Sequence, residues 1–334
     1  MADEAISFRL LDLKESIGTV LKCMGVLDLI SFSLCSKKMA ATVKSLNIPI
    51  TQFQVNIDDK FSVRLKVQDA DVYLWFRQEG YSRELEVTYV EGYIQGRHRA
   101  ASSYKRWNEP ISGNGWLRHL MEIFNQEKIN VVFNFDRIEL DSILTIVKDL
   151  KISCLVINYI PGEYTAMILR RFNTVENVEV DNILLHDTSG DAILLNNYHN
   201  LRIRGSYPKL DHLSTINCFH FKSYANMSSK ELSRFLKLWL SGSNPRLRRC
   251  EFDFLPNEIG MDRFEGTLQE DAVMRGITFH RISQDTDREF SMNGVVETIQ
   301  GGLDFMKKNG TKATVKIENR DEDEDSIFQM FVWL

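Results

Sequence analysis

The sequence predicts a mixed α+β and α/β chain: a small N-terminal three-helix module, an antiparallel β segment, a strand–helix solenoid and a β-rich C-terminal cap. Three patterns predict this order. Apolar residues recur at helical spacing near the start, alternate with polar residues over residues 50–95, and then mark strands and helices in turn from residue 116 onward. A length of 334 residues is enough for about two domains.

Residues 5–48 are expected to fold as three short helices. Asp28 and Ser36 stand where the N-caps of the second and third helix would lie. The first helix carries four apolar residues at i, i+3, i+4, i+7 spacing: Ile17, Val20, Leu21 and Met24. A unit of about 40 residues buries too little surface to be stable alone, and this one holds more apolar side chains than its own core can enclose. The surplus is expected to meet the rest of the chain or another protein.

The next two segments are a sheet and a connection. Apolar and polar residues alternate in four runs, at residues 50–57, 61–67, 72–76 and 85–90, which predicts an antiparallel sheet over residues 50–95. Residues 96–115 are polar and contain Gly and Ser, so an exposed loop or linker is expected there. A small basic cluster within it either keeps the loop soluble or binds an anion. Its members are Arg97, His98, Arg99, Lys105 and Arg106.

Residues 116–334 are predicted to form one repeat-like domain. Its strands are expected to centre near Phe133, Val156, Glu179, Arg202, His220 and Phe252. The first intervals are about 23 residues, within the range of leucine-rich repeats, roughly 20–29. Units of this kind stack into a curved solenoid with a parallel sheet. The full leucine-rich consensus is absent, so the likeness is one of architecture.

The clearest helix of this domain follows Ser228. Ser228 and Glu231 form a capping box, and Gly242 is a stop signal. Beyond residue 256 the repeat is lost, and short strands at residues 276–282, 289–292, 315–317 and 327–333 are expected to cap the solenoid. The acidic run at residues 321–325 indicates a solvated hairpin loop, because a lone acidic run specifies no metal geometry.

Composition argues against several classes of protein. The net charge of −5, from 41 basic and 46 acidic residues, argues against a nucleic-acid-binding protein. No apolar stretch approaches the roughly 18 residues of a membrane span, and Asp3 and Glu4 stand where a secretory signal would be basic, so an intracellular protein of the cytoplasm, nucleus or both is expected. Five scattered cysteines and seven scattered histidines suggest no disulfide framework, metal site or cofactor. No catalytic motif such as G-x-S-x-G occurs, so no enzyme is predicted.

Several ordered stretches carry a resemblance to a known family. The first is Phe8-x-Leu10-Leu11-x-Leu13, Val20-Leu21-x-x-Met24, Asp28-Leu29-Ile30-x-Phe32-Ser33-Leu34 and Ser36-Lys37-Lys38. The second is Leu232-x-x-Phe235-Leu236-x-x-Trp239-x-x-Gly242-x-Asn244-Pro245-x-Leu247. Stretches beginning at Trp116 and Ile327 also fit. The first resembles an F-box in the divergent form of a large group of nematode F-box proteins, and the second resembles the type 2 F-box-associated region of the same group.

The resemblance implies a substrate receptor that lacks enzymatic activity. The F-box would bind the Skp-type adaptor of a cullin-RING ubiquitin ligase, and the C-terminal domain would hold a target protein. Lys14 departs from the family, which usually has Pro at this helix start. The residues expected to contact the adaptor are Leu10, Leu11, Leu13, Ile17, Val20, Leu21, Met24, Leu29 and Leu34.

The target-binding residues are not identified by the sequence. Arg202 and Arg204, like His220 and Lys222, alternate along their strands and are expected to share one face, either as a binding surface or as an ordinary solvated face. Two other functions stay open. One is a repeat-type scaffold that does not assemble into a ligase, because of Lys14. The other is a hydrolase built on α/β units, which would need a nucleophile, a base and an orienting group in one cleft.

Overall fold

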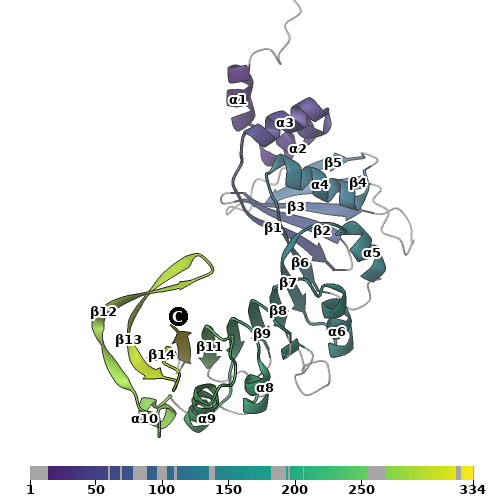
Figure 1. Ribbon diagram of the computed structural model, residues 1–334. Helices are drawn as coiled ribbons and strands as arrows, with labels where there is room; N and C mark the ends of the chain where they lie inside the picture. Colours follow the sequence, from purple (N-terminus) through teal and green to yellow (C-terminus); the bar gives the residue numbers. More distant parts are fainter. Residues whose placement is uncertain are drawn as a thin grey trace, which may run out of the picture. The chain divides into compact units, whose positions relative to one another are not determined.

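The computed structural model describes residues 14–58, 61–67, 70–77, 89–95, 104–108, 111–134, 140–181, 193–194, 196–205, 207–254, 268–320 and 325–333. The chain divides into two compact units, Met1–Ser153 and Cys154–Leu334, here called unit 1 and unit 2 (Figure 1). Each unit contains both helices and strands, as predicted.

Unit 1 begins with three short helices, α1 (Lys14–Lys22), α2 (Val26–Leu34) and α3 (Lys37–Ser45). Ser36 caps α3 as predicted, because its side chain accepts the backbone N–H of Met39.

The prediction that Asp28 caps the second helix was wrong. Gly25 occupies the N-cap of α2, and Asp28 lies in the first turn of the helix. A carboxylate there still interacts favourably with the positive end of the helix dipole.

The sheet of unit 1 has the strand order β6-β1-β2-β3-β4-β5. Neighbours from β1 to β5 pair antiparallel, as predicted for residues 50–95, and β6 pairs parallel to β1. Alternate residues such as Val55, Val63 and Leu74 are fully buried, which accounts for the period of two in the sequence. The bounds are β1 (Ile50–Ile57), β2 (Phe61–Val67), β3 (Ala70–Arg77), β4 (Tyr89–Gln95), β5 (Tyr104–Trp107) and β6 (Ile129–Phe133). Two further helices, α4 (Gly113–Ile123) and α5 (Leu140–Ile146), complete the unit.

The prediction of an exposed linker over residues 96–115 was wrong in two places. Tyr104–Trp107 form strand β5, which pairs with β4, and the Trp107 side chain is only 7% exposed. Helix α4 begins at Gly113 after the N-cap Ser112, so the Gly-Asn-Gly sequence is its first turn and not a separate loop. Residues 96–103, which hold the other part of the basic cluster, lie outside the described residues.

Unit 2 contains the parallel strands β7 to β11, with helices α6, α8 and α9 along one face (Figure 1). Alternate residues of β9 and β10, such as Leu201 and Phe221, are buried. The residues on either side of them along each strand are half exposed. The strands are β7 (Ile152–Asn158), β8 (Asn177–Asp181), β9 (Asn200–Arg204), β10 (His220–Tyr224) and β11 (Arg249–Phe254). The helices are α6 (Gly162–Arg171), α8 (Leu210–Thr215), α9 (Ser229–Leu240) and the short α10 (Glu270–Val273). Both hydrogen bonds of the predicted Ser228–Glu231 capping box are present at the start of α9.

The described residues show a mixed sheet and do not show a leucine-rich-repeat solenoid. In unit 2 the order is β12-β13-β14-β15-β11-β10-β9-β8-β7, so four antiparallel strands extend the parallel ones through the β15–β11 pair. The predicted alternation of strands and helices is present, but the C-terminal strands continue the sheet and do not form a separate cap.

The C-terminal strands are longer than predicted. They are β12 (His280–Met292), β13 (Val295–Met306), β14 (Lys312–Arg320) and β15 (Asp325–Val332). The prediction of two short strands at residues 276–282 and 289–292 was wrong, because residues 280–292 form one strand. Strand β13 was not predicted at all. Residues 321–324 of the acidic run lie outside the described residues.

Strand β13 bends at two consecutive glycines. Gly301 and Gly302 have φ angles of 64° and 99°, which L side chains rarely adopt. A Cβ atom on Gly302 would lie 2.9 Å from the carbonyl oxygen of Val315. The first half of β13 pairs with β12 only, and the second half pairs with β14 as well. Residues 287–300 therefore leave the sheet as a two-stranded ribbon, called the ribbon below.

Candidate functional site

Helix α2 is fastened to the edge of the unit 1 sheet by polar contacts. The Trp107 indole Nε1–H donates to Ser31 Oγ at 2.9 Å. Lys105 Nζ lies 2.5 Å from Asp28 Oδ1. A Cβ atom on Gly92 of β4 would lie 2.9 Å from Leu27 Cδ2, so only glycine lets the helix approach this closely. The N-terminal helices are therefore packed onto β4 and β5.

Ser33 and His119 join α2 to α4. Their Oγ and Nε2 atoms are 2.8 Å apart, and Ser33 Oγ also donates to the Ile30 carbonyl at 2.7 Å. A serine hydroxyl has one proton, so the bond to His119 is one in which Nε2–H donates. Burial lowers the pKa of His119. Ser33 is buried and its proton is already engaged, so this serine–histidine pair does not present a nucleophile to a substrate.

The nine residues predicted to bind the adaptor have different environments. Leu10, Leu11 and Leu13 lie outside the described residues, as does the side chain of Ile17 in α1. Val20 is 62% exposed, and Met24 and Leu34 are half-buried. Leu21 and Leu29 are each only 3% exposed, which makes them part of the internal packing. Adaptor binding by these nine residues stays a prediction, and the exposed apolar surface lies at Val20 rather than at Leu21 or Leu29.

The sequence reasoning missed the residues that hold α2 in place. Lys105 and Trp107 lie in a segment interpreted as a linker, and His119 was considered only as a possible metal ligand. The available signal was the aromatic residue at each end of residues 104–107, because aromatic residues are enriched in strands.

The face of the unit 2 sheet opposite to α6, α8 and α9 carries a network of charged side chains. Arg202 and Lys222 are paired in register, so the predicted residues of β9 and β10 do share one face. Arg204 Nη2 lies 3.2 Å from Glu179 Oε2. The carboxylate oxygens of Glu251 lie 2.9 Å from His220 Nε2, 3.3 Å from Lys222 Nζ and 2.8 Å from Arg249 Nε. Most of these charges are therefore partnered within the chain.

The neighbours of Glu251 determine its acidity. Burial raises the pKa of this carboxyl, but the hydrogen bond from His220 and the positive charges of Arg249 and Lys222 outweigh it and lower the pKa from 4.5 to about 2. A depressed folded-state pKa means that the ionised form stabilises the fold.

Stability of unit 2 is therefore expected to fall as the pH drops from about 4.5 toward 2. A Glu251→Gln variant is expected to be less stable than the unchanged chain near neutral pH, and the difference is expected to shrink in this acid range. Urea unfolding at a series of pH values measures it. Glu318→Gln is the control, because Glu318 makes a surface ion pair with Lys316 and such pairs contribute little. A pH-independent difference for Glu251→Gln would contradict the assignment.

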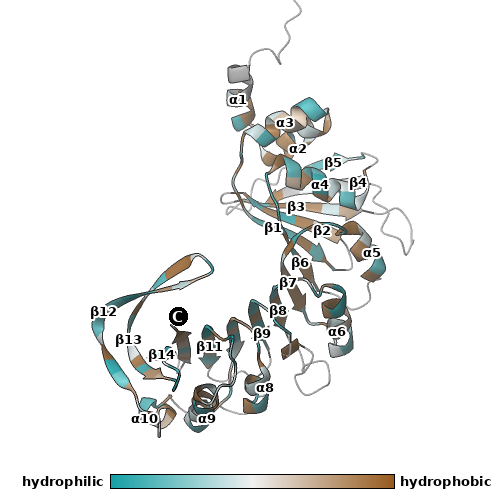
Figure 2. Cartoon of the chain, viewed as in Figure 1, coloured by the Kyte–Doolittle hydropathy of each residue, from teal (hydrophilic) through white to brown (hydrophobic). Residues whose placement is uncertain are grey.

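The ribbon folds over part of this charged face. Phe290 and Ile299 of the ribbon pack on Phe331 of β15, and all three are buried. Arg249 pairs with Glu297 of the ribbon, and His199 on the loop before β9 contacts Asn293 at its tip. Figure 1 shows the ribbon on the side of β11 opposite to α9, and Figure 2 shows apolar residues near its tip. The charged face is therefore partly an internal surface.

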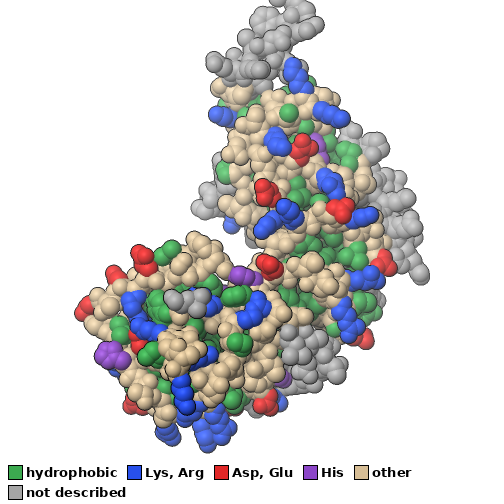
Figure 3. Space-filling view, viewed as in Figure 1, with side chains coloured by type: hydrophobic (Ala, Val, Ile, Leu, Met, Phe, Trp, Pro, Cys, Tyr) green, Lys and Arg blue, Asp and Glu red, His purple; other side chains and the backbone are tan. Residues whose placement is uncertain are grey.

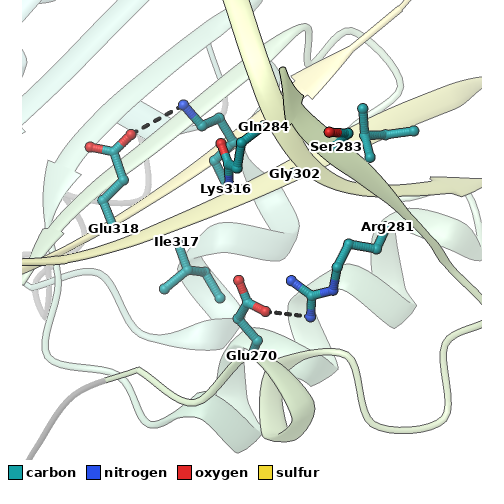
Figure 4. Close-up of a pocket in the computed structure, with 9 residues that line it drawn as sticks. Glu270, Arg281, Ser283, Gln284, Gly302, Lys316, Ile317 and Glu318 are labelled. Carbon is teal, nitrogen blue, oxygen red and sulfur yellow. Dashed lines mark hydrogen bonds and ion pairs between the residues drawn. The ribbon is translucent and has the colours of Figure 1, made fainter. Parts of the chain in front are cut away.

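Two pockets of different character are lined by described residues of unit 2. One, of about 500 Å³, is lined by residues including Gly302 and Ile317 and holds two ion pairs (Figure 4). Glu270 lies 2.6 Å from Arg281, and Lys316 lies 3.2 Å from Glu318. The second, of about 910 Å³, lies between the end of α9 and the β13–β14 turn. Among the described residues no cluster of His, Cys, Asp or Glu could hold a metal ion. Within the same residues, no helix combines the length and apolar character needed to cross a membrane.

Two family models match the chain. Residues 14–51, which span α1 to α3, match the F-box domain, and residues 191–252, which span β9 to most of β11, match a domain described as F-box associated. These matches confirm the resemblance of the two segments to an F-box and an F-box-associated region. No curated protein and no solved structure matches the chain.

Proposed function

We propose that this chain, which carries an F-box domain followed by an F-box-associated region, is a substrate-recruiting adaptor of an SCF-type cullin-RING ubiquitin ligase. The two domains together are those of substrate-recognition adaptors in general, which are not enzymes. The single observation that carries the proposal is the presence of both domains in this order. The role is proposed to be intracellular, in the cytoplasm, the nucleus or both.

On the adaptor side, the proposed contact is an apolar patch around the first two helices. Val20 is exposed in α1, and Met24 after α1 and Leu34 at the end of α2 are partly exposed. Docking would remove this surface from water at roughly 25 cal/mol per Å², less the cost of association. Leu21 and Leu29 would act indirectly, because they hold the helices that carry the patch.

Lys14 does not argue against a folded F-box. It is the first residue of α1, the position where Pro is favoured because the N–H has no partner within the helix. Lys at this position loses the fixed φ of Pro but leaves the helix and its apolar residues in place. A scaffold that has lost ligase assembly is the alternative, and Lys14→Pro would then create adaptor binding that the unchanged chain lacks.

On the target side, the proposed binding region is unit 2, which contains the F-box-associated match. Its described surface offers the charged strand face, the ribbon and two pockets. The leucine-rich-repeat-like curvature inferred from the spacing of the strands remains part of this proposal.

The test is capture of a purified Skp-type adaptor by the full-length chain. Val20→Asp is expected to weaken capture at least about tenfold, because it places a charge in an apolar contact. Val295→Asp is the matched control, since Val295 is an equally exposed valine on unit 2 and its change should leave capture intact. Point variants are better than deleting residues 1–46, because deletion would uncover Trp107 and its neighbours in unit 1. If the unchanged chain captures no adaptor while a known F-box protein does, the proposal fails.

A further inference from the structure

The larger pocket of unit 2 has an apolar floor. Trp239 of α9, Leu247 before β11 and Val332 at the end of β15 line it and are almost fully buried. Met306, at the end of β13, also lines it and is 61% exposed. An exposed methionine beside a buried tryptophan offers a deformable apolar surface to a ligand. The pocket can therefore accept an apolar side chain.

The rim of this pocket is positively charged. Arg248, Lys307 and Lys308 line it, and none of its lining residues is Asp or Glu. Arg248 Nε donates to the Val332 carbonyl at 3.1 Å, and Lys307 Nζ lies 4.0 Å above the Trp239 ring. Neither contact neutralises charge. Burial lowers the pKa of Arg248 and of Lys307, and no carboxylate among the described residues opposes this.

Two other described clusters of cations are neutralised within the chain. In the pocket of Figure 4, Arg281 pairs with Glu270 and Lys316 pairs with Glu318. On the strand face, Lys222 lies between Glu251 and Asp253. Figure 3 shows further Lys and Arg side chains over the α9 end of unit 2. The rim of the larger pocket thus differs from these clusters in having no acidic residue among its described lining residues, although the chain as a whole carries a charge of −5.

We propose that this pocket binds an acidic peptide segment, with one apolar side chain on the Trp239–Met306 floor and flanking carboxylates on Arg248, Lys307 and Lys308. Charge complementarity selects the occupant, because a basic or neutral segment would leave the three cations unpaired. Residues 239–248 belong to the F-box-associated match. This inference rests on the proposed function in one respect: the segment would be the part of the target that the ligase recognises.

The test uses the full-length chain and a short fluorescein-labelled peptide with a central Leu between Asp and Glu residues. Fluorescence polarisation is expected to show binding that weakens with salt, and at least about tenfold weaker binding for the Lys307→Glu/Lys308→Glu variant. A peptide with Asn and Gln at the acidic positions, and one with Gly in place of Leu, are both expected to bind more weakly. Lys230→Glu, at the opposite end of α9, is the matched control.

Two further measurements keep the outcomes distinct. The Lys308 side chain is exposed, and changing it alone to Glu leaves the Lys307–Trp239 contact intact. Weaker peptide binding by the Lys308→Glu variant would therefore not reflect misfolding. A benzophenone at the Leu position of the peptide is expected to cross-link to Met306. Equal binding of the acidic and amide peptides, or cross-linking elsewhere, overturns the proposal. Adaptor capture is measured on the same samples: if it is retained while the acidic peptide fails, only the pocket assignment falls, and if capture fails, the proposed function falls.

Discussion

An Ile30→Asp chain is expected to lose the folded state of α1 to α3, and adaptor capture with it. Ile30 is 0% exposed and lies in a module of only about 40 residues, which has little other burial to offset the loss. The change places a carboxylate where the native apolar side chain is fully enclosed. Burying it without a partner is expected to cost about 4 kcal/mol or more. Hydrogen exchange is expected to rise throughout α1 to α3.

Val20→Asp separates this effect from a direct loss of contact. It introduces the same charge in the same module at a position exposed to water, so α1 to α3 should keep their protection while adaptor capture is weakened. Unit 2 serves as the internal reference, because it forms a separate compact unit whose exchange should not change in either variant. If α2 stays protected from hydrogen exchange in the Ile30→Asp variant, the three helices do not depend on the buried packing around Ile30.

Local signals in the sequence were enough to predict many elements. The Ser228–Glu231 box marks the start of α9 because both of its hydrogen bonds close within one turn. The alternation over residues 50–67 predicts β1 and β2 because the buried face of each strand is apolar and the other face is not. Such signals depend only on neighbouring residues, so they survive without knowledge of the fold.

Elements defined by distant partners were missed. The apolar residues of β13 do not follow a single regular period, because Gly301 and Gly302 divide the strand into two halves with different neighbours. Strand β5 was taken for a linker, since its single buried residue, Trp107, is covered by α2, more than seventy positions earlier. In both cases the pairing that makes the strand is set by tertiary contacts.

The same limit applies to the candidate site. Helical spacing places Val20 and Leu21 in one apolar group, yet one is exposed and the other buried. Neighbouring residues of a helix point in different directions, and the sequence does not reveal which side the rest of the chain covers. On unit 2 the ribbon covers part of the strand face that was considered for target binding. The larger pocket was not foreseen, because Trp239 and Lys307 lie far apart in the chain.

The ribbon that covers this face is anchored by one buried carboxylate, and Asp304→Ala is expected to destabilise unit 2 by about 3–5 kcal/mol. Asp304 accepts two hydrogen bonds from Arg288 Nη1, at 2.8 and 3.0 Å, and one from Thr314 Oγ1 at 2.6 Å. Lys312 Nζ lies 2.6 Å from Asp304 Oδ2. Burial raises the pKa of Asp304, but the hydrogen bonds from Lys312, Thr314 and Arg288 outweigh this and lower it. Removing the carboxylate leaves the half-buried Arg288 guanidinium without its counter-charge.

The loss should appear first in the ribbon, because Arg288 also donates to the Gly301 carbonyl at the bend, at 2.6 Å. Hydrogen exchange is expected to rise around Phe290 and Ile299, and the urea midpoint of unit 2 to fall. Asp287→Ala is the matched control: this carboxylate lies next to Arg288 on β12, is exposed, and accepts one hydrogen bond from Gln300, so its removal should change stability by about 0.5 kcal/mol or less. If both variants unfold at the same urea concentration, the Asp304 network does not hold the ribbon. The cover over the strand face must then come from the packing of Phe290 and Ile299 on Phe331 and from the polar contacts of Arg249 and His199.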